Sequence, residues 1–205
     1  MAFEEYLKSK YNFNEPIYID EIRFENYSRS WIYMQIKKLV ESGILKRFDA
    51  GIYYFPLKMS FGDTCLDPRE VVRKRYLSDG DEVYGYLAGL SMKNAAGLST
   101  QCPNMLELVS NNESARVRDI KIGSQRVRAR RSRTSITKEN VAVLQFLDLM
   151  NVTNFRFMDD NERYMLKRYI RDSGVTLDQI EQYAGFFPAK ATRSLMESGV
   201  VNELT

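Results

Sequence analysis

The chain has no histidine among its 205 residues. Histidine is the commonest general base in enzymes and the commonest metal ligand in proteins. The nucleophile and phosphate-binding motifs GxSxG, GxxxxGK[S/T] and GxGxxG are missing as well. The nearest carboxylate pair, Asp159 and Asp160, is expected to open a helix, because acidic side chains stabilise a helix N-terminus. We therefore expect a protein that is not an enzyme, with no metal site and no cofactor.

Cysteines and long apolar runs are also scarce. Cys65 and Cys102 are far apart and lack the spacing of a zinc site or a disulfide framework, so we expect reduced thiols. The most apolar run, VAVLQFLDLM, is too short to span a bilayer and contains Gln145 and Asp148. The first residues, MAFEEYLKSK, lack the pattern of a secretory signal. These features predict a cytoplasmic protein that does not enter a membrane.

Hydrophobic residues make up 44% of the chain and charged residues 28%, a balance that supports a folded core. The order of helix and strand patterns predicts an α+β fold that is mostly helical. We expect a winged helix-turn-helix at residues 1–56, a linker at 57–66, a mixed α/β domain with basic strands at 67–155, and a small helical region at 156–205.

The N-terminal part has the element order of a winged helix. A helix is expected at residues 2–10, a short strand at 17–19 and a brief helix at 20–25. Ser28 then caps a longer helix that runs to about residue 42, where Gly43 supplies the left-handed conformation that ends it.

A two-stranded ribbon follows this helix. ILKRF and IYYF are rich in strand-forming residues, and DAG between them has hairpin chemistry, with Gly51 at a position of positive φ. In a winged helix the long helix enters the major groove of DNA and the ribbon reaches the neighbouring backbone. The pattern therefore predicts double-stranded DNA as the partner.

The long helix has an apolar and a polar face. Ile32, Ile36, Leu39 and Val40 recur at helical spacing and are expected in the core. The candidate DNA contacts lie elsewhere: Arg29, Ser30 and Tyr33 for base edges, Lys37, Lys38, Lys46 and Arg47 for phosphates, and Ser28 at the helix tip, where exposed amides favour phosphate. Each lysine alone also fits a solvated face. Residues 1–56 carry 8 basic and 8 acidic side chains, whereas most dedicated DNA-binding domains are basic.

Positive charge is concentrated in residues 116–135, RVRDIKIGSQRVRARRSRTS, which hold 8 basic side chains and 1 acidic one. Two strands joined at Gly123-Ser124 are expected here. Strand alternation places Arg126, Arg128 and Arg130 on one face, with Arg116 and Arg118 as candidates on the neighbouring strand. Repulsion along this row requires an anionic partner or abundant water. A sheet face closed by acidic side chains of the C-terminal helices, a nucleic-acid backbone and an acidic protein partner remain alternatives.

Other elements are expected along the C-terminal part. Residues 84–99 have the composition of a short helix stopped at Gly97, and Thr137 is expected to cap a buried helix. Thr176 and Gln179 form a capping-box pattern. The sequence LMESGVV (residues 195–201) repeats the pattern of LVESGIL (39–45), a helix with a glycine stop and an apolar, strand-like tail. A shared glycine stop and a second helix-turn-helix at residues 176–201 both fit this repeat.

Several stretches together resemble the AbiEi-like antitoxin family of type IV toxin–antitoxin systems, across residues 1–155. They are the segment ending in GILKRFDAGIYYF, the block YGYLAGLSMKNAAGLSTQCPNMLELVSN, the basic strand and ITKENVAVLQFLDLMN. The resemblance implies a bacterial cytoplasmic protein of phage defence whose winged helix, with recognition helix 28–38 and wing 46–54, represses its own operon. It also implies that the C-terminal domain counters a nucleotidyltransferase-like toxin without forming a stable complex.

Two other functions fit the N-terminal pattern. Winged helices also serve as protein-interaction modules, and the chain also fits a general transcriptional regulator that has no toxin partner. An enzyme acting on nucleic acid through carboxylates alone would need clustered acidic residues, and the sequence offers no such cluster.

Overall fold

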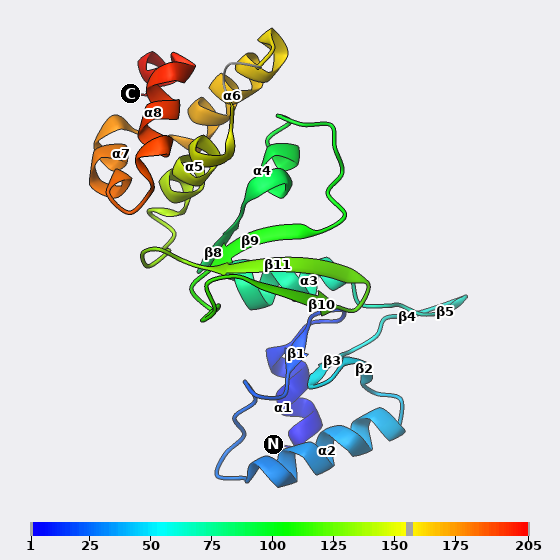
Figure 1. The fold of residues 1–205 in the computed structure, drawn as a ribbon. Helices are drawn as coiled ribbons and strands as arrows, with labels where there is room; N and C mark the ends of the chain where they lie inside the picture. The colour runs from blue at the N-terminus through cyan, green and yellow to red at the C-terminus, as the bar shows by residue number, and fades with distance from the viewer. Residues whose placement is uncertain (1, 155–157, 205) are drawn as a thin grey trace. The chain divides into compact units, whose positions relative to one another are not determined.

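A computed structural model describes residues 2–154 and 158–204 and shows an α+β fold, as predicted (Figure 1). Helices take a larger share of the described residues than strands. Backbone contacts divide the chain into two compact units. The first comprises Met1–Lys74 with Ile122–Ser124, and the second comprises Arg75–Lys121 with Gln125–Thr205.

The helices of the first unit begin and end close to where the sequence places them. Helix α1 spans Phe3–Lys10 and α2 spans Arg29–Glu41. The Ser28 hydroxyl accepts a hydrogen bond from the Trp31 amide at 3.3 Å, which is the predicted N-cap. Gly43 has a φ of 74°, the left-handed conformation expected after the helix.

The first unit also has a three-stranded sheet in the order β1-β3-β2. Strand β1 spans Ile17–Tyr18, β2 spans Lys46–Asp49 and β3 spans Ile52–Tyr54. The β2–β3 hairpin is the predicted ribbon, and Gly51 in its turn has a φ of 74°. One face of α2 packs with α1 and the sheet in a single apolar cluster, to which Leu7, Ile32 and Ile36 contribute.

The brief helix expected at residues 20–25 is wrong, because the chain forms turns at residues 19–21 and 25–26 and has no regular secondary structure between them. Ile22 and Phe24 are both buried, whereas Arg23 between them is exposed. Side chains two residues apart share a face in extended chain and not in a helix. The need to bury both apolar side chains therefore overrides the helical tendency of this stretch.

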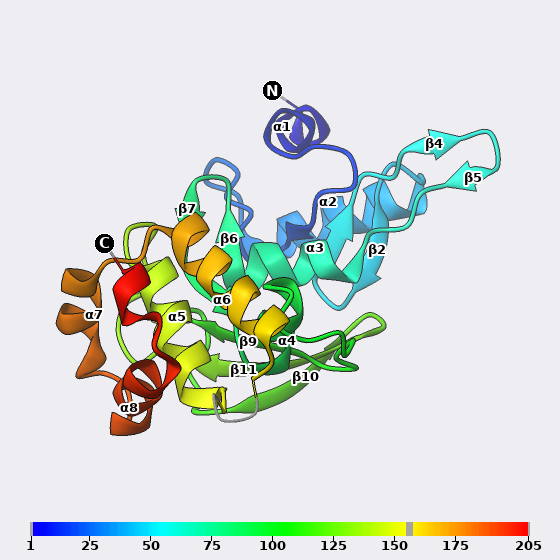
Figure 2. The ribbon, with the colours of Figure 1, turned by 90° about the horizontal axis from the view of Figure 1, so that it is seen from above.

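Residues 57–66, expected as a linker, contain a small hairpin that projects from the first unit (Figure 2). Its strands are β4, Lys58–Met59, and β5, Gly62–Asp63. Helix α3, Pro68–Val72, follows and is capped by the Asp67 side chain. It continues as a π-helix through Arg73–Leu77.

The second unit is built on a four-stranded sheet in the order β10-β11-β9-β8. The strands span Gly85–Leu87 (β8), Leu106–Ser110 (β9), Arg118–Ile122 (β10) and Gln125–Arg131 (β11). Strand β9 pairs antiparallel with β8 and parallel with β11. A separate hairpin is formed by β6, Ser78–Asp79, and β7, Glu82–Val83.

The helix expected across residues 84–99 is half wrong, because the segment splits into strand β8 and helix α4, Gly89–Ala95. Gly85 explains the strand. A Cβ atom at this position would lie 1.9 Å from the Tyr76 carbonyl oxygen and 2.8 Å from the Val109 carbonyl oxygen. Glycine is therefore needed for close backbone approach. Gly97 ends α4 with a φ of 70°, as predicted.

Helix α5, Val141–Val152, is the centre of the helical part and is buried as predicted. It packs against α4, α7, α8 and strand β8 (Figure 1). Its N-cap is Asn140, and the cap expected at Thr137 is wrong by three residues. Thr137 instead begins a single turn, in which its carbonyl accepts a hydrogen bond from the Val141 amide at 3.0 Å.

Three further helices complete the second unit: α6, Asp160–Ser173, α7, Leu177–Ala184, and α8, Ala189–Ser198. The predicted capping box of Thr176 and Gln179 opens α7, and Asp159 caps α6. The strand-like tail expected after Gly199 is wrong, because Val200–Glu203 form a 3-10 helix. None of the described helices is long and apolar enough to cross a membrane.

Candidate nucleic-acid surface and arginine pocket

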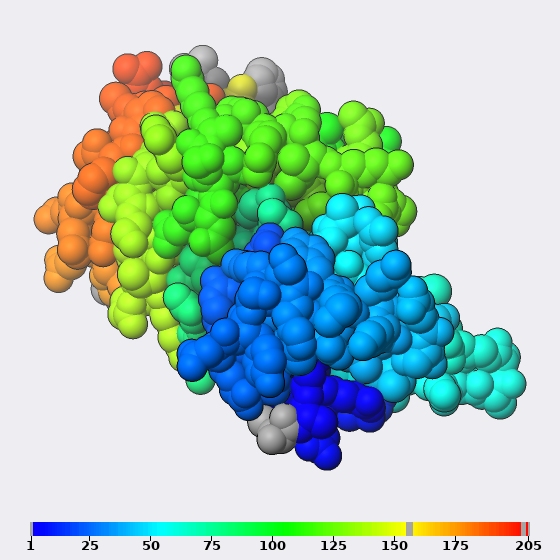
Figure 3. All heavy atoms as spheres, turned by 90° about the horizontal axis from the view of Figure 1, so that it is seen from below, coloured from blue at the N-terminus to red at the C-terminus, as the bar shows by residue number. Residues whose placement is uncertain are grey.

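The outer face of α2 is exposed. Tyr33 is 49% exposed and Met34 46%, whereas Ile32 on the opposite face is 3% exposed. Ser28, Ser30, Lys37 and Lys38 are exposed as well. Figure 3 shows this segment at the surface of the molecule. The polar candidate residues of the predicted recognition helix are therefore open to a partner.

Arg29 differs from the other candidates on α2, because it is bound to the chain's own backbone. Its Nη2 donates a hydrogen bond to the Asp20 carbonyl at 3.0 Å, and its Nη1 donates to the Ile19 carbonyl at 3.3 Å. A weaker pair with the Asp20 carboxylate spans 3.4 Å. These contacts tie the start of α2 to the turn after β1, so Arg29 has a structural role that the sequence did not indicate.

The basic residues of the ribbon and the helix end have acidic neighbours. Lys46 Nζ lies 3.0 Å from the Asp63 carboxylate, and this hydrogen bond raises the pKa of Lys46. Arg47 is exposed and donates to the Asp49 carbonyl at 3.3 Å. Lys37 Nζ lies 3.8 Å from Glu41, a loose surface pair. Lys38 has no carboxylate partner among the described residues. The helix thus presents two cations that are free to reorient.

The alternation expected on β11 is confirmed. Val127 and Ala129 are fully buried, whereas Arg126 and Arg128 are exposed. Two arginines of this region are paired within the hairpin and the loop before it. Arg128 forms two hydrogen bonds of 2.8 Å with Asp119, which lower the pKa of Asp119 and raise that of Arg128.

Arg118 binds a buried carboxylate. Its Nε and Nη2 lie 3.1 and 2.9 Å from Glu113, whose side chain is 0% exposed. The Coulomb attraction of Glu113 raises the pKa of Arg118. Glu113 also accepts a hydrogen bond from the Ala115 amide at 2.9 Å. Arg118 therefore fixes the loop between β9 and β10, and this accounts for one arginine that we expected to contact an anion.

Four arginines line a pocket between the sheet and α5, which has a volume of about 420 Å³. Its lining combines residues from β8, β9, β11, the two loops that flank the β10–β11 hairpin, and α5: Tyr86, Val109, Arg116, Val117, Arg130, Arg131, Ser132, Arg133 and Asp148. Of the arginines predicted to contact an anion, the pocket brings Arg116 and Arg130 together. Arg118, Arg126 and Arg128 lie outside its lining.

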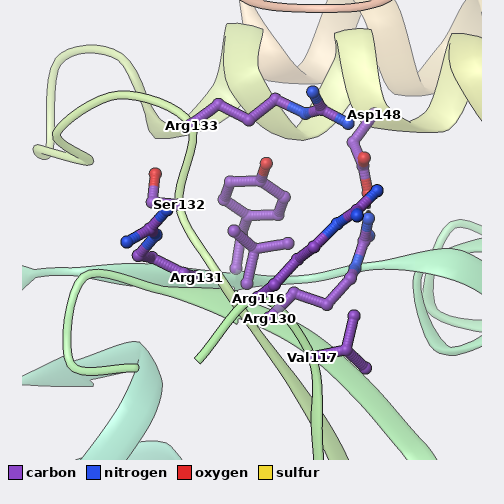
Figure 4. Close-up of a pocket in the computed structure, with 9 residues that line it drawn as sticks. Arg116, Val117, Arg130, Arg131, Ser132, Arg133 and Asp148 are labelled. Atoms are coloured by element: carbon purple, nitrogen blue, oxygen red, sulfur yellow. Dashed lines mark hydrogen bonds and ion pairs between the residues drawn. The ribbon is translucent and has the colours of Figure 1, made fainter. Parts of the chain in front are cut away.

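One carboxylate lies among these arginines. Arg130 Nη2 is 2.6 Å from Asp148 Oδ2, and the Asp148 side chain is 3% exposed. Figure 4 shows the guanidinium groups of Arg116, Arg130 and Arg133 directed toward Asp148, whereas Arg131 points to the opposite side beside Ser132. An acidic side chain of a C-terminal helix therefore does close over part of the arginine row.

Hydrogen bonds hold both loops that frame the pocket. The Asn111 side chain donates to the Ile136 carbonyl at 2.8 Å and accepts from the Ile136 amide at 3.0 Å. The Arg131 amide donates to the Ala115 carbonyl at 3.2 Å. Arg133 lies over the ring of Phe187, 5.7 Å from its centroid. The pocket is therefore built by contacts that do not depend on a ligand.

The sequence did not predict this pocket, and Tyr86, Arg131, Ser132, Arg133 and Asp148 were missed as site residues. Burial raises the pKa of Tyr86, so its phenol stays protonated and neutral. One feature could have indicated the site. Asp148 stands within an otherwise apolar helical run, and a buried carboxylate requires a cationic partner.

Comparison of the chain with models of known protein families and with curated proteins found no match. Within residues 2–154 and 158–204, no cluster of three or more acidic or cysteine side chains is arranged to hold a metal ion. Cys65 and Cys102 are exposed free thiols.

Proposed function

We propose that the chain is a DNA-binding antitoxin whose first unit is a winged helix that binds operator DNA and represses the operon encoding the antitoxin and its toxin. The observation that carries the proposal is the exposed face of α2, where Ser30, Tyr33, Lys37 and Lys38 lie opposite a buried apolar stripe.

The strand order supports a winged helix. In the first unit β1 pairs antiparallel with β3, and β3 pairs antiparallel with β2 to form the ribbon that follows α2. A helix of 13 residues followed by a hairpin suits a major groove and the backbone beside it. The turn region at residues 20–25 takes the place of a short second helix.

The residues of α2 divide by role. Ser30 and Tyr33 stand in the first turns, where a recognition helix contacts base edges, and Ser28 marks the N-terminal tip, where free amides favour phosphate. Lys37, Lys38 and Arg47 are suited to phosphate, which positions the protein without specifying sequence. Lys46 can join them only by exchanging its contact with Asp63.

The antitoxin part of the proposal depends on the resemblance of residues 1–155 to the AbiEi-like family. On that basis the second unit counters a nucleotidyltransferase-like toxin without a stable complex, and the protein works in the cytoplasm as a regulator and not as an enzyme. The test is growth rescue: the chain expressed with the toxin of its own operon should restore growth, and a chain that leaves the toxin fully active contradicts this part.

DNA binding is tested separately with the DNA upstream of the chain's own gene, in a mobility-shift assay against unrelated DNA of equal length. We expect a specific shift that is weakened by Tyr33→Ala. The matched control is Lys190→Ala, an exposed cation on α8. Absence of a specific shift, or a shift that is insensitive to truncation of both Tyr33 and Lys37, contradicts operator binding by α2.

A second function has support from the same face. Tyr33 and Met34 are about half exposed, Tyr27 is 47% exposed, and residues 1–56 have equal numbers of acidic and basic side chains. Exposed aromatic and methionine side chains are enriched at protein interfaces. If the first unit binds a protein in place of DNA, the upstream DNA gives no shift and Tyr33→Ala weakens capture of that partner.

A further inference from the structure

We propose that the arginine pocket of the second unit binds a nucleoside diphosphate or triphosphate through its phosphate groups. This inference goes beyond DNA binding by the first unit, because all residues that line the pocket belong to the second unit.

The net positive charge of the pocket favours binding of an anion. Its lining holds four arginines and one aspartate. Arg130 neutralises Asp148 at 2.6 Å, and Arg116, Arg131 and Arg133 have no carboxylate partner within the described part of the chain. Cations that line one cavity repel one another unless an anion or water lies between them. The guanidinium fork suits phosphate oxygens better than any other common biological anion apart from carboxylate.

The amount of charge favours more than one phosphate. A phosphate monoester carries about −1.5 to −2 charges at pH 7. A diphosphate group therefore matches three guanidinium groups better than a monophosphate does. The guanidinium groups of Arg116 and Arg133 lie near Asp148, whereas Arg131 is directed the other way, beside Ser132 (Figure 4). A chain of two or three phosphates is longer than a single phosphate and offers oxygens to cations at more than one position along the pocket.

The size of the pocket favours an organic group beyond the phosphates. A volume of about 420 Å³ lies within the usual range of small-molecule sites, roughly 300–1,000 Å³. Tyr86 and Val109 supply apolar lining, and arginine side chains stack on flat rings. A nucleoside meets these conditions, because it joins an aromatic base to the phosphate chain.

The pocket is preorganised for this ligand. Arg116 stands in the loop that Glu113 and Arg118 fix, and Arg133 is held over Phe187. Asn111 ties the loop of residues 132–136 to the end of β9. These side chains therefore lose little conformational entropy when a ligand binds.

The test is isothermal titration of the full chain with ADP, GDP, CDP and UDP in turn, with inorganic pyrophosphate and adenosine as separate arms. We expect saturable binding of at least one nucleotide. Arg116→Gln and Arg133→Gln should each weaken it about tenfold or more, because each removes a charge-assisted contact. Arg116 is exposed in a loop, so its variant should keep the fold, and circular dichroism of the variant checks this.

Arg126→Gln is the matched control, because it removes an exposed arginine of β11 that does not line the pocket. Its binding should equal that of the wild type. The proposal is overturned if no nucleotide binds, if Arg116→Gln and Arg133→Gln bind as tightly as the wild type, or if Arg126→Gln weakens binding equally. Equal affinity for pyrophosphate and for every nucleotide overturns the assignment to a nucleoside phosphate.

Discussion

Replacement of Arg130 by methionine removes the partner of a carboxylate that the fold keeps out of water. Methionine preserves much of the apolar stem of arginine, so the change tests the charge and not the packing. Asp148 is 3% exposed in its side chain and lies 2.6 Å from Arg130, which is 25% exposed.

The expected loss follows from these values. Removing one partner of a buried ion pair costs roughly 3–5 kcal/mol, because the other charge is left without compensation. Arg130 is partly exposed, and Arg116 and Arg133 lie in the same pocket. We therefore expect the lower end, about 3 kcal/mol. In a protein of this size each kcal/mol lowers the Tm by about 2–4 °C, which gives a loss of about 6–12 °C.

The assay is a double-mutant cycle of Arg130→Met and Asp148→Leu, followed by urea unfolding. Far-ultraviolet circular dichroism follows all helices, most of whose residues lie in the second unit, and the fluorescence of Trp31, the single tryptophan, follows the first unit separately. The double variant should recover most of the stability, because an apolar pair replaces the ionic one. Arg126→Met serves as the matched control. If Arg130→Met is no more destabilising than Arg126→Met, Arg130 does not neutralise a buried Asp148.

The other predictions concern the backbone, the pH response and the DNA surface. Gly85→Ala should destabilise the second unit by about 3 kcal/mol or more in urea unfolding, because the new methyl group would lie 1.9 Å from the Tyr76 carbonyl oxygen. Mild overpacking costs about 1 kcal/mol, so a smaller loss of stability would contradict this close approach. Burial opposes ionisation of Glu15, but hydrogen bonds from the Asn12 amide and from Lys74 at 2.6 Å lower its pKa below 4.5. The stabilisation by this carboxylate is therefore complete above pH 4.5 and is lost as the pH falls through the pKa of the folded state. The Tm of Glu15→Gln should therefore decline less in acid than the Tm of the wild type. Equal declines of Tm in both proteins would contradict a stabilising role for the Glu15 carboxylate. Lys37→Ala with Lys38→Ala should lower the salt dependence of operator binding by about two units of logarithmic slope, and an unchanged slope means that neither lysine contacts phosphate.

Local chemistry explains which elements the sequence could predict. Ser28, Gly43 and Gly51 define the ends of α2 and the turn of the ribbon through their own side chains or their lack of one, and no distant residue is needed. The same holds for the capping box of Thr176 and Gln179. Helix ends and turns of this kind can be predicted from the sequence, because they depend only on the backbone within a few residues.

The errors arose where distant contacts decide. Residues 20–25 do not form a helix because Ile22 and Phe24 must both reach the core, and strand β8 forms because Gly85 approaches two carbonyls from other elements. The pocket was missed for the same reason. It brings Arg116 and Arg130 close to the Asp148 carboxylate on α5. The spacing of these residues along the chain does not indicate that they lie together in the fold.

The parallel pairing of β9 with β11 has a consequence for the order in which the second unit folds. The β10–β11 hairpin closes through a turn of only Gly123 and Ser124, whereas Leu106 must find Val127 across the whole hairpin. Contacts between residues that are close in sequence form faster than contacts that must close a long loop. We expect the arginine-bearing hairpin to form as an early, highly charged intermediate that docks on β9 afterwards.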